Sequence, residues 1–422
     1  MAQLTDDCFA FSGELMTTAE ALDRLTRTVL PVTEREAVPV GAALGRVLAA
    51  DVTASRSVPP YDNSAVDGYA VYFADLDTEG ETRLPTTGRA AAGHPLPHPA
   101  RRGEAVRIFT GAVMPDGEAG GPDTVLMQED CAEADGHVTI PPGIKEGANR
   151  RRAGEDITEG STILHAGRRL RPQDLGLAAS VGRTEVEVYV PLRVAVFSTG
   201  DELREPGAEA PPGAIYDANR YSLTGLLRDL GATVVDLGIV EDRFETIRDT
   251  LAAAAREADL IITSGGMSVG DEDHVRAAVE DGGSLHFWRL AIKPGRPVGL
   301  GQIGETPFVG LPGNPVAMMV TFLRFARPLV LGLAGSTDLT PKLFQVRAGF
   351  AHKKKAGRRE WVRARLEADA DGAPIARKFP REGAGILSSL VEADGLVEIA
   401  EEVTRLEAGG LVDFLPFAEV SR

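Results

Sequence analysis

The hydrophobic positions near the start of the chain recur with the period of an α-helix. Leu22, Leu25 and Val29 form an apolar stripe, and a threonine and a glutamate three residues apart precede it with the spacing of a capping box. A helix is therefore predicted over 17–30, and a second helix is predicted over 40–50.

Short apolar runs separated by glycine and proline turns follow from 61 to 149, a pattern typical of a small β-rich domain. A basic linker closes this region with Arg150, Arg151 and Arg152, and such a run is as readily a solvated surface as a ligand site. After about residue 337 the short apolar runs and turns return, so a second β domain is expected there.

Between 192 and 333, apolar runs of strand length alternate with segments of helical period. Strands separated by helices predict a parallel, doubly wound sheet, and such sheets bind ligands at the carboxyl ends of their strands. The predicted elements are strands at 193–197, 233–240, 260–263, 285–292, 297–303 and 307–311, with helices capped by Asn219, over 242–257, through 280, and from Asn314 and Pro315.

These patterns together predict a multidomain α/β protein. It has a doubly wound, mostly parallel sheet domain, a β-rich insertion domain and a C-terminal β domain. The expected boundaries are 17–58 with 147–188 for an elongated linking domain, whose N-terminal helix can pack on the sheet domain, 59–146 for the β-rich insertion, 189–336 for the sheet domain and 337–422 for the C-terminal β domain.

Composition and charge exclude several classes of partner and site. The 422 residues include 45 Lys and Arg against 62 Asp and Glu, and a net charge of −17 argues against nucleic acid or an anionic membrane as a partner. Two cysteines exclude a disulfide framework and a structural zinc site. The acidic start of the chain lacks a signal-peptide pattern, so a cytoplasmic location is expected. The longest apolar stretch, 316–334, contains Arg324 and Arg327, which favours a buried helix over a membrane span.

Two motif matches are weak. The glycines of 299–304 fit the dinucleotide fingerprint by letter, but the segment lies between two predicted strands and opens no helix. The segment 266–270 fits a nucleophile elbow around Ser268, but an elbow turns straight off its strand and here Ser264, Gly265 and Gly266 intervene, so a serine hydrolase is disfavoured.

A stronger candidate is the glycine-rich loop after the strand at 260–263. Its backbone can approach an anion closely and its hydroxyls can donate to it, whereas a plain turn between a strand and a helix is the alternative. The candidate substrate-binding residues of this loop are Ser264, Gly265, Gly266 and Ser268.

Acidic residues follow three of the predicted strands, as Glu202, Asp242 and Asp273. Each alone could be a helix cap, but three strand ends can converge on one crevice. Carboxylates near a phosphate imply Mg²⁺, which takes oxygen ligands.

Two stiff, proline-containing turns add cations and a helix start to the same crevice. Lys293 and Arg296 lie on one turn, and Pro312 and Pro315 on the other. Carboxylates, cations and free backbone N–H groups together fit phosphoryl or oxyanion chemistry on a nucleotide-like substrate.

In these segments the chain resembles the molybdopterin molybdenumtransferases, the MoeA family that includes the E domains of gephyrin and its plant relatives. The matching stretches run in order through most of the chain. They are PPYDNSAVDGYAV (59–71), RIFTGAVMP (107–115), RRRAGEDI (150–157), VAVFSTGDEL (194–203), GAIYDANR (213–220), DLIITSGGMSVGDEDH (259–274), RLAIKPGRP (289–297), GLPGNPV (310–316) and GILSSL (385–390).

The resemblance implies insertion of molybdate into adenylylated molybdopterin with release of AMP, dependent on Mg²⁺. It also implies a homodimer whose active site lies between the doubly wound domain of one protomer and the β-rich domain of the other. The pterin adenylyltransferase and molybdoenzyme delivery proteins are expected as further partners.

Roles carried over from the family fall on matching residues. The implied catalytic residues are Asp62, Thr110 and Asp156 outside the sheet domain and Glu202, Asp242 and Asp273 within it, the last three as metal ligands. Lys293 and Arg296 would lie near the oxyanion, beside the turn formed by Pro312 and Pro315; the family often has lysine where Arg296 stands. The segment 113–124 is longer and richer in glycine than the family pattern.

Two other functions compete with this interpretation. A scaffold protein on the same fold is disfavoured because the sequence has no long disordered linker and no fused second domain. A pterin adenylyltransferase would need only the doubly wound domain, so the additional β domains argue against it.

Overall fold

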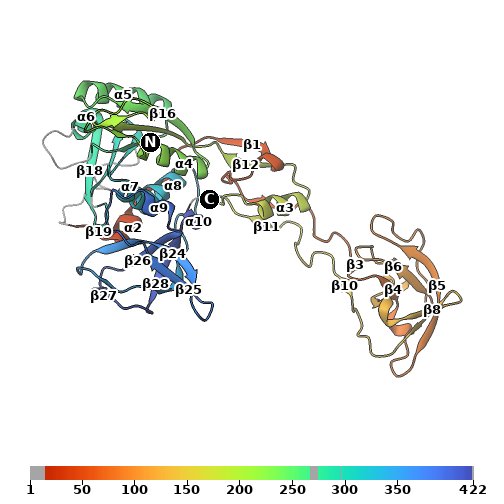
Figure 1. The fold of residues 1–422 in the computed structure, drawn as a ribbon. Helices are drawn as coiled ribbons and strands as arrows, with labels where there is room; N and C mark the ends of the chain where they lie inside the picture. The colour runs from red at the N-terminus through yellow and green to blue at the C-terminus, as the bar shows by residue number, and fades with distance from the viewer. Residues whose placement is uncertain (1–14, 267–273, 296, 421–422) are drawn as a thin grey trace.

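The computed structural model describes residues 15–266, 274–295 and 297–420. The molecule is elongated, with a β-rich region at one end, a narrow connection, and an α/β region beside a C-terminal β barrel at the other end (Figure 1). Ser268, Asp273 and Arg296, three of the predicted site residues, lie outside the described residues.

The α/β region is built on a six-stranded sheet. Four neighbouring strands are mutually parallel, and the fifth strand runs antiparallel to them and to the sixth strand at the edge, which confirms a mostly parallel, doubly wound sheet. In spatial order the strands are β16 (Thr233–Val240), β13 (Arg193–Thr199), β17 (Leu260–Ser264), β21 (Thr306–Leu311), β20 (Pro297–Ile303) and β18 (Gly283–Arg289).

Two hydrophobic cores cover the two faces of this sheet, because successive side chains of a strand point to opposite faces. Val194 and Val196 of β13 belong to one core, and Ala195 and Phe197 belong to the other. The helices of this region are α4 (Asn219–Asp229), α5 (Phe244–Glu257), α6 (His274–Gly282), α7 (Pro315–Thr321), the π-helical turn η5 (Phe322–Ala326) and α8 (Arg327–Leu333).

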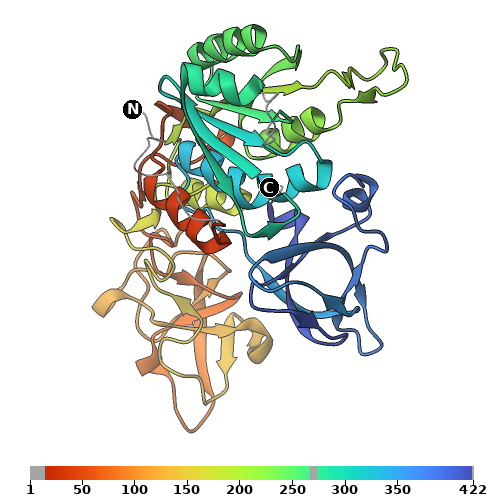
Figure 2. The same cartoon turned by 90° about the vertical axis from the view of Figure 1, so that its left-hand side faces the viewer.

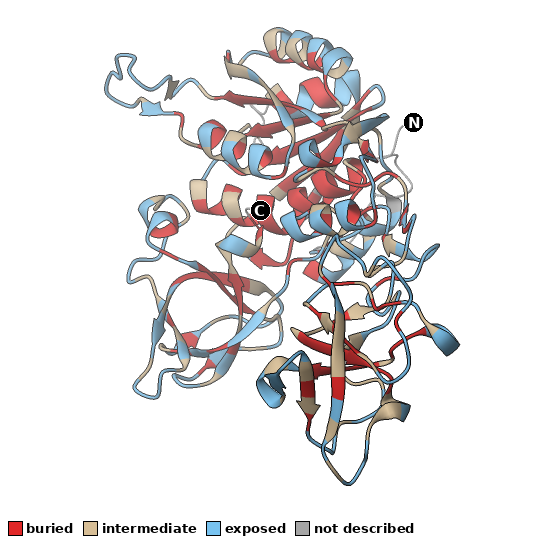
Figure 3. Ribbon diagram, turned by 90° about the vertical axis from the view of Figure 1, so that its right-hand side faces the viewer, coloured by how far each residue is buried: buried red, intermediate tan, exposed pale blue. Residues whose placement is uncertain are grey.

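The segment Pro315–Leu333 is the central core helix of the α/β region. Its mean hydropathy of 1.6 and its length would suit a membrane span, but 94% of it is buried inside the protein. The expected buried helix is thus confirmed, and Figure 3 shows the buried residues running through this region and its sheet.

The first helix of the described residues, α2 (Thr18–Thr28), carries the predicted capping box. The Thr17 hydroxyl accepts from the Glu20 backbone N–H at 3.2 Å, and the Glu20 carboxylate accepts from the Thr17 N–H at 2.9 Å. Ala21 and Leu25 pack into a core of the α/β region.

The predicted helix over 40–50 is wrong. Only a 3-10 turn forms there, η1 (Val40–Ala42). Gly45 has φ +75°, which breaks a helix, and the following residues form single bridges, Val47 with Arg169 and Leu48 with Val188. Pairing with distant segments buries these side chains better than a local helix would.

The connection between the two ends consists of paired outgoing and returning segments. Each ladder is antiparallel, and a short helix, α3 (Pro172–Ser180), packs beside them (Figure 1). The ladders are β1 (Arg35–Pro39) with β12 (Glu185–Tyr189), β2 (Val52–Thr53) with β11 (Thr162–Leu164), and β3 (Asn63–Ser64) with β10 (Arg150–Arg151).

The remaining two regions are sheets with their own small cores. The β-rich sheet has the order β7 (Thr124–Met127), β4 (Gly68–Val71), β6 (Ala105–Ile108), β5 (Thr82–Ala90), β9 (His137–Ile140) and β8 (Ala132–Ala134). The C-terminal strands are β22 (Phe344–Ala348), β23 (His352–Lys353), β24 (Arg359–Ala368), β25 (Pro374–Lys378), β26 (Gly395–Ile399), β27 (Arg405–Leu406) and β28 (Leu411–Pro416), with helices α9 (Ser388–Val391) and α10 (Phe417–Val420).

The C-terminal sheet closes on itself because β24 pairs with both β25 and β26. A short strand from the α/β region, β19 (Ile292–Lys293), joins it in parallel and places Lys293 opposite Glu360 of β24. This pairing brings the predicted cationic turn against the barrel, which the sequence pattern did not indicate.

Candidate functional site

The glycine-rich loop after β17 lies where the strand order of the sheet reverses. The chain passes from β13 outward to β16 and then returns to β17 on the other side of β13, so the carboxyl ends of β13 and β17 flank the ligand-binding crevice expected for such a sheet. Ser264 ends β17, and Gly265 and Gly266 follow with φ of +97° and +62°.

These two glycines are required by close packing as well as by their dihedral angles. A Cβ at Gly265 would lie 3.1 Å from the Thr199 carbonyl oxygen, and one at Gly266 would lie 2.5 Å from a methyl carbon of Val275. Glycine is therefore the residue that lets the backbone turn here, and the Gly265 N–H donates to the Leu311 carbonyl at 3.1 Å.

The side chain of Asn219 ties the glycine-rich loop to the proline-containing turn before α7. Its Nδ2 donates to the Ser264 hydroxyl and to the Gly313 carbonyl, both at 2.7 Å. Asn219 is thus not the predicted helix cap: α4 begins at Asn219 itself, and the amide spans two loops instead. The sequence signal for this role was only its place in the GAIYDANR stretch.

Several buried polar atoms at the carboxyl ends of these strands make no hydrogen bond to the described residues. The hydroxyls of Ser198 and Thr199 and the Oδ1 atom of Asn219 are buried without a hydrogen-bond partner among the described residues. Buried polar groups are normally satisfied, so unpaired ones in a crevice suit a polar ligand.

Glu202 and Asp242 follow the neighbouring strands β13 and β16, as predicted. Within the described parts of the chain, no hydrogen bond or ion pair engages either carboxylate, and no group of three or more His, Cys, Asp or Glu is arranged to hold a metal ion. The third member of the predicted set, Asp273, lies outside those parts.

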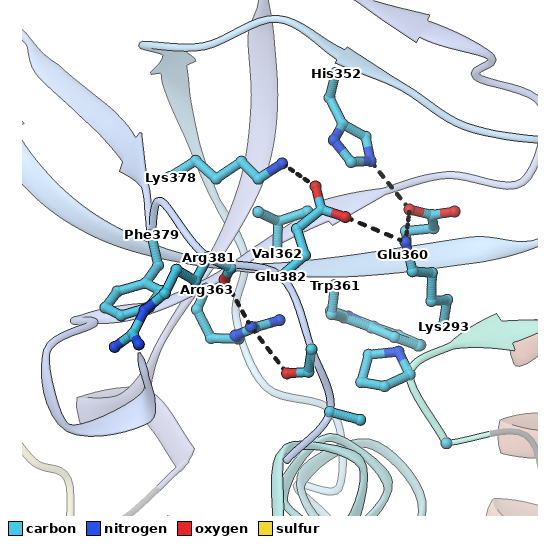
Figure 4. Close-up of a pocket in the computed structure, with 14 residues that line it drawn as sticks. Lys293, His352, Glu360, Trp361, Val362, Arg363, Lys378, Phe379, Arg381 and Glu382 are labelled. Atoms are coloured by element: carbon cyan, nitrogen blue, oxygen red, sulfur yellow. Dashed lines mark hydrogen bonds and ion pairs between the residues drawn. The ribbon is translucent and has the colours of Figure 1, made fainter. Parts of the chain in front are cut away.

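A cavity of about 300 Å³ lies between the α/β region and the C-terminal barrel (Figure 4). Lys293 of the α/β region forms part of the cavity wall, and residues of the barrel form most of the rest. The charged and ionisable residues that line it are Lys293, Arg363, Lys378, Arg381, His352, Glu360 and Glu382.

This cavity adjoins the proline-containing turn at the sheet edge. The backbone N–H of Val316, at the start of α7, donates to the Ala384 carbonyl on the cavity wall at 2.9 Å. The turn that contains Pro312 and Pro315 therefore contacts the glycine-rich loop on one side and the cavity wall on the other.

Arg363 fixes one wall of the cavity. Its Nε donates to the Ser389 hydroxyl at 3.0 Å, and its Nη2 donates to the carbonyls of Arg381 at 3.4 Å and Gly383 at 3.2 Å. Sequence reasoning missed Arg363, Lys378 and Glu360; the one available signal was the neighbouring GILSSL stretch, which contains Ser389.

Glu360 is buried beneath Lys293 and accepts hydrogen bonds from two cationic or ionisable groups. His352 Nε2 lies 3.0 Å from one carboxylate oxygen, and Arg358 Nε donates to the other at 2.8 Å. Burial alone would raise the pKa of Glu360, but the His352 and Arg358 hydrogen bonds outweigh it and hold the pKa below its ordinary value.

The predicted residues of the β-rich end form a separate group. The Asp62 carboxylate accepts from Arg150 Nε at 2.6 Å and from the Ala153 N–H at 2.7 Å. Burial alone would raise the pKa of Asp62, but the Ala153 and Arg150 hydrogen bonds leave it lowered. Arg150 thus pairs with a partly buried carboxylate rather than only facing solvent.

Thr110 and Asp156 lie on loops next to Asp62. Thr110 donates its backbone N–H and its hydroxyl to Asp67, at 2.8 and 2.7 Å, and these bonds lower the pKa of Asp67. The Asp156 N–H donates to the Val58 carbonyl. Asp67, which orients Thr110, was not singled out from the sequence although it lies in the PPYDNSAVDGYAV stretch.

Within one chain, this second group and the sheet-edge crevice lie at opposite ends of the molecule, as two perpendicular views show (Figures 1 and 2). The described chain therefore brings together Ser264, Gly265, Gly266, Pro312 and Pro315, with Lys293 in the adjoining cavity. Glu202 and Asp242 follow the neighbouring strands β13 and β16 at the same sheet edge. One chain does not bring Asp62, Thr110 and Asp156 to them.

Comparisons with known proteins agree along the whole length. Residues 16–182 match the model of the MoeA N-terminal region (domain I and II), residues 195–332 that of a probable molybdopterin binding domain, and residues 345–417 that of the MoeA C-terminal region (domain IV).

Curated relatives and solved structures cover nearly the same span. The chain is 36% identical over 405 residues to the molybdopterin molybdenumtransferase of Haemophilus influenzae, covering 96% of this chain and 99% of that protein. It is 37% identical over 406 residues to molybdopterin molybdenumtransferase 2 of Mycobacterium tuberculosis, covering 91% and 95%. A crystal structure of the molybdopterin biosynthesis MoeA protein from Pyrococcus horikoshii matches with a TM-score of 0.80 at 27% identity, covering 96% of this chain and 100% of that one.

Proposed function

The chain belongs to the MoeA family, and we propose that it inserts molybdate into adenylylated molybdopterin and releases AMP. The names of its relatives support its assignment as a transferase of molybdenum cofactor biosynthesis. The adenylylated substrate, the metal dependence and the assembly are part of the proposal.

The observation that carries the proposal is the cationic cavity beside the sheet edge. Four cations, Lys293, Arg363, Lys378 and Arg381, line it against two carboxylates, so the cavity is net positive. Charge-assisted hydrogen bonds from lysine and arginine are the contacts that a tetrahedral oxyanion dianion such as molybdate accepts. The chain as a whole has a net charge of −17, so a cavity with a net positive lining stands apart from the rest of the protein and favours an anionic ligand.

The neighbouring crevice suits the phosphate-containing substrate. The glycine-rich loop and the hydroxyl of Ser264 would contact the pyrophosphate, with the Gly265 N–H itself held by the Leu311 carbonyl at 3.1 Å. The turn at Pro312 separates this crevice from the oxyanion cavity by a short, stiff segment. The residues of this chain thus hold two reactants side by side, which lowers the entropic part of the barrier.

Mg²⁺ fits the donors at the sheet edge. Glu202 and Asp242 supply carboxylate oxygens without competing partners among the described residues, and Mg²⁺ is usually held by one or two carboxylates together with substrate phosphates. When bound, the ion would neutralise charge on the pyrophosphate.

We include a homodimer in the proposal. The group formed by Asp62, Thr110 and Asp156 can meet the crevice only if a second chain supplies it, because one chain holds the two at opposite ends (Figure 1). Mixing Asp62→Asn with Glu202→Gln protein, each inactive alone, should restore about a quarter of wild-type activity, since half of the random dimers carry one intact site. A mixture as inactive as its components would contradict a shared site.

The function itself is tested by AMP release from adenylylated molybdopterin with molybdate and Mg²⁺. Lys293→Met should lower the rate by on the order of a hundredfold, as loss of one electrostatic contact does. Lys355→Met, which removes an exposed lysine outside the cavity, should not.

Equal rates for the two lysine variants would contradict the oxyanion cavity. Formation of pyrophosphate from ATP and molybdopterin would favour an adenylyltransferase, and absence of any turnover would favour a scaffold. A cytoplasmic location and contact with the pterin adenylyltransferase and molybdoenzyme delivery proteins complete the proposal.

A further inference from the structure

The two carboxylates in the oxyanion cavity are held very differently (Figure 4). The Glu360 side chain is 3% exposed and is fixed by His352 and Arg358. The Glu382 side chain is 56% exposed, and among the described residues it pairs only with the ends of two flexible lysines, Lys378 by a hydrogen bond and Lys293 at 3.8 Å.

The backbone under Glu382 is anchored, although its side chain is not. Arg363 donates to the carbonyls on either side of Glu382, those of Arg381 and Gly383, and the next carbonyl, of Ala384, accepts from Val316. The loop therefore holds the Cα of Glu382 at the cavity while the carboxylate can rotate toward solvent.

Glu382 is an anion at neutral pH. The hydrogen bond from Lys378 and the charges of Lys378 and Lys293 hold the pKa of its carboxyl below the ordinary value. The two lysines that an incoming oxyanion would contact are therefore already paired with a negative charge, and that charge would repel a second anion.

We propose that Glu382 is a displaceable carboxylate that pairs with Lys293 and Lys378 in the empty cavity and moves to solvent when an oxyanion binds. The inference rests on the proposed function, because it requires an oxyanion in this cavity. Rotation of a half-exposed side chain on a fixed backbone suffices, and Glu360, which is buried and anchored, stays in place to position Lys293.

Such a group raises the dissociation constant of every anion by the same factor. A monovalent anion such as chloride binds lysines weakly and would then leave the cavity empty at ordinary concentrations. A dianion makes stronger contacts with the four cations and still binds. Glu382 therefore keeps the cavity clear of abundant monovalent anions and sets the affinity threshold for molybdate.

The test measures binding of molybdate alone to the full-length protein by isothermal titration calorimetry at low and high salt. Glu382→Gln, which keeps the size and removes the charge, should tighten binding roughly three- to tenfold at low salt, with a smaller gain at high salt because exposed charges are screened. Chloride should compete with molybdate for Glu382→Gln protein at a correspondingly lower concentration than for wild type.

The matched control is Glu367→Gln on the same barrel. Glu367 is 48% exposed and pairs with Arg377, but neither residue lines the cavity. This variant should bind molybdate within about twofold of wild type. An effect of Glu367→Gln equal to that of Glu382→Gln would show a general charge effect and overturn the inference.

A third variant separates this inference from the proposed function. If Lys293→Met weakens molybdate binding but Glu382→Gln does not tighten it, Glu382 is not a competitor and only the inference fails. If Lys293→Met and wild type bind molybdate equally, the cavity is not the oxyanion site and the proposed function loses its main support as well.

Discussion

Glu398 joins the C-terminal barrel to the α/β region through a buried ion pair. Its carboxylate accepts from the Trp361 indole at 2.9 Å, lies 3.4 Å from Arg324 Nη2 and bonds to Arg359. The side chains of Glu398 and Arg324 are only 2% and 5% exposed. Since Trp361 lines the oxyanion cavity, this pair also supports the cavity wall.

Glu398→Gln should destabilise the protein by about 3–5 kcal/mol, because it leaves the Arg324 cation buried without a counter-charge. Arg324 has little else to compensate, since its Nε and Nη1 atoms are buried without hydrogen-bond partners among the described residues. Burial lowers the pKa of Arg324, and the Glu398 charge opposes that effect. Arg359 contributes less to the loss because it keeps Glu401 as a partner.

Urea denaturation followed by tryptophan fluorescence measures this loss, because both tryptophans, Trp288 and Trp361, are buried. With a slope of about 3 kcal/mol per molar urea, the midpoint should fall by roughly 1–2 M. Glu407→Gln, which breaks an exposed pair with Arg405 on the same barrel, should cost less than about 0.5 kcal/mol.

A second substitution tests the cause. Adding Arg324→Met to Glu398→Gln removes the unpaired cation, and the double variant should regain most of the lost stability. The reasoning would be refuted if Glu398→Gln cost no more than the exposed control, or if the double variant were no more stable than Glu398→Gln alone.

Two further predictions concern pH and packing. Because the pKa of Glu360 is lowered in the folded protein, its contribution to stability is complete above the ordinary glutamate pKa of 4.5 and is lost as the pH falls through the lower folded pKa. The stability difference between wild type and Glu360→Gln should therefore be full at neutral pH and shrink progressively in acid below that ordinary value, and a difference that stays constant throughout the acid range would contradict it. Gly68→Ala should unfold the β-rich region or make the protein insoluble, since the new Cβ would lie 1.6 Å from the Leu126 carbonyl oxygen, whereas Gly176→Ala in the open surface of α3 should raise stability by about 0.5–1 kcal/mol; thermal melting of both variants checks this.

Regular elements of the α/β region were predictable because their burial is periodic. The predicted strand at 233–240 coincides with β16, and the strand predicted at 260–263 is β17 without its last residue. β17 is buried along its whole length, and a strand buried on both faces reads as one apolar run. The capping box at Thr17 was also predictable, because it depends on residues three apart. The helix over 40–50 failed because its apolar residues pair with segments more than a hundred residues away.

The site residues also divide into those that a local sequence pattern indicates and those that only distant contacts place. The glycine-rich loop and the turn at Pro312 carry their chemistry in adjacent residues, so the sequence indicated an anion site there. The bond from Asn219 to Ser264 and the orientation of Thr110 by Asp67 join residues more than forty positions apart, and no local pattern marks them.

The sequence by itself determined which family the chain resembles, where its strands and helices run in the sheet region, and which loops can bind anions, because these depend on local spacing and on chemistry within short segments. Only the tertiary structure decided that Lys293 joins the barrel beside Glu360 and Glu382, and that Asp62 and Glu202 lie at opposite ends of one chain. Those placements follow from strand pairing and core packing between distant segments, whose energies depend on surfaces that exist only once the chain has folded.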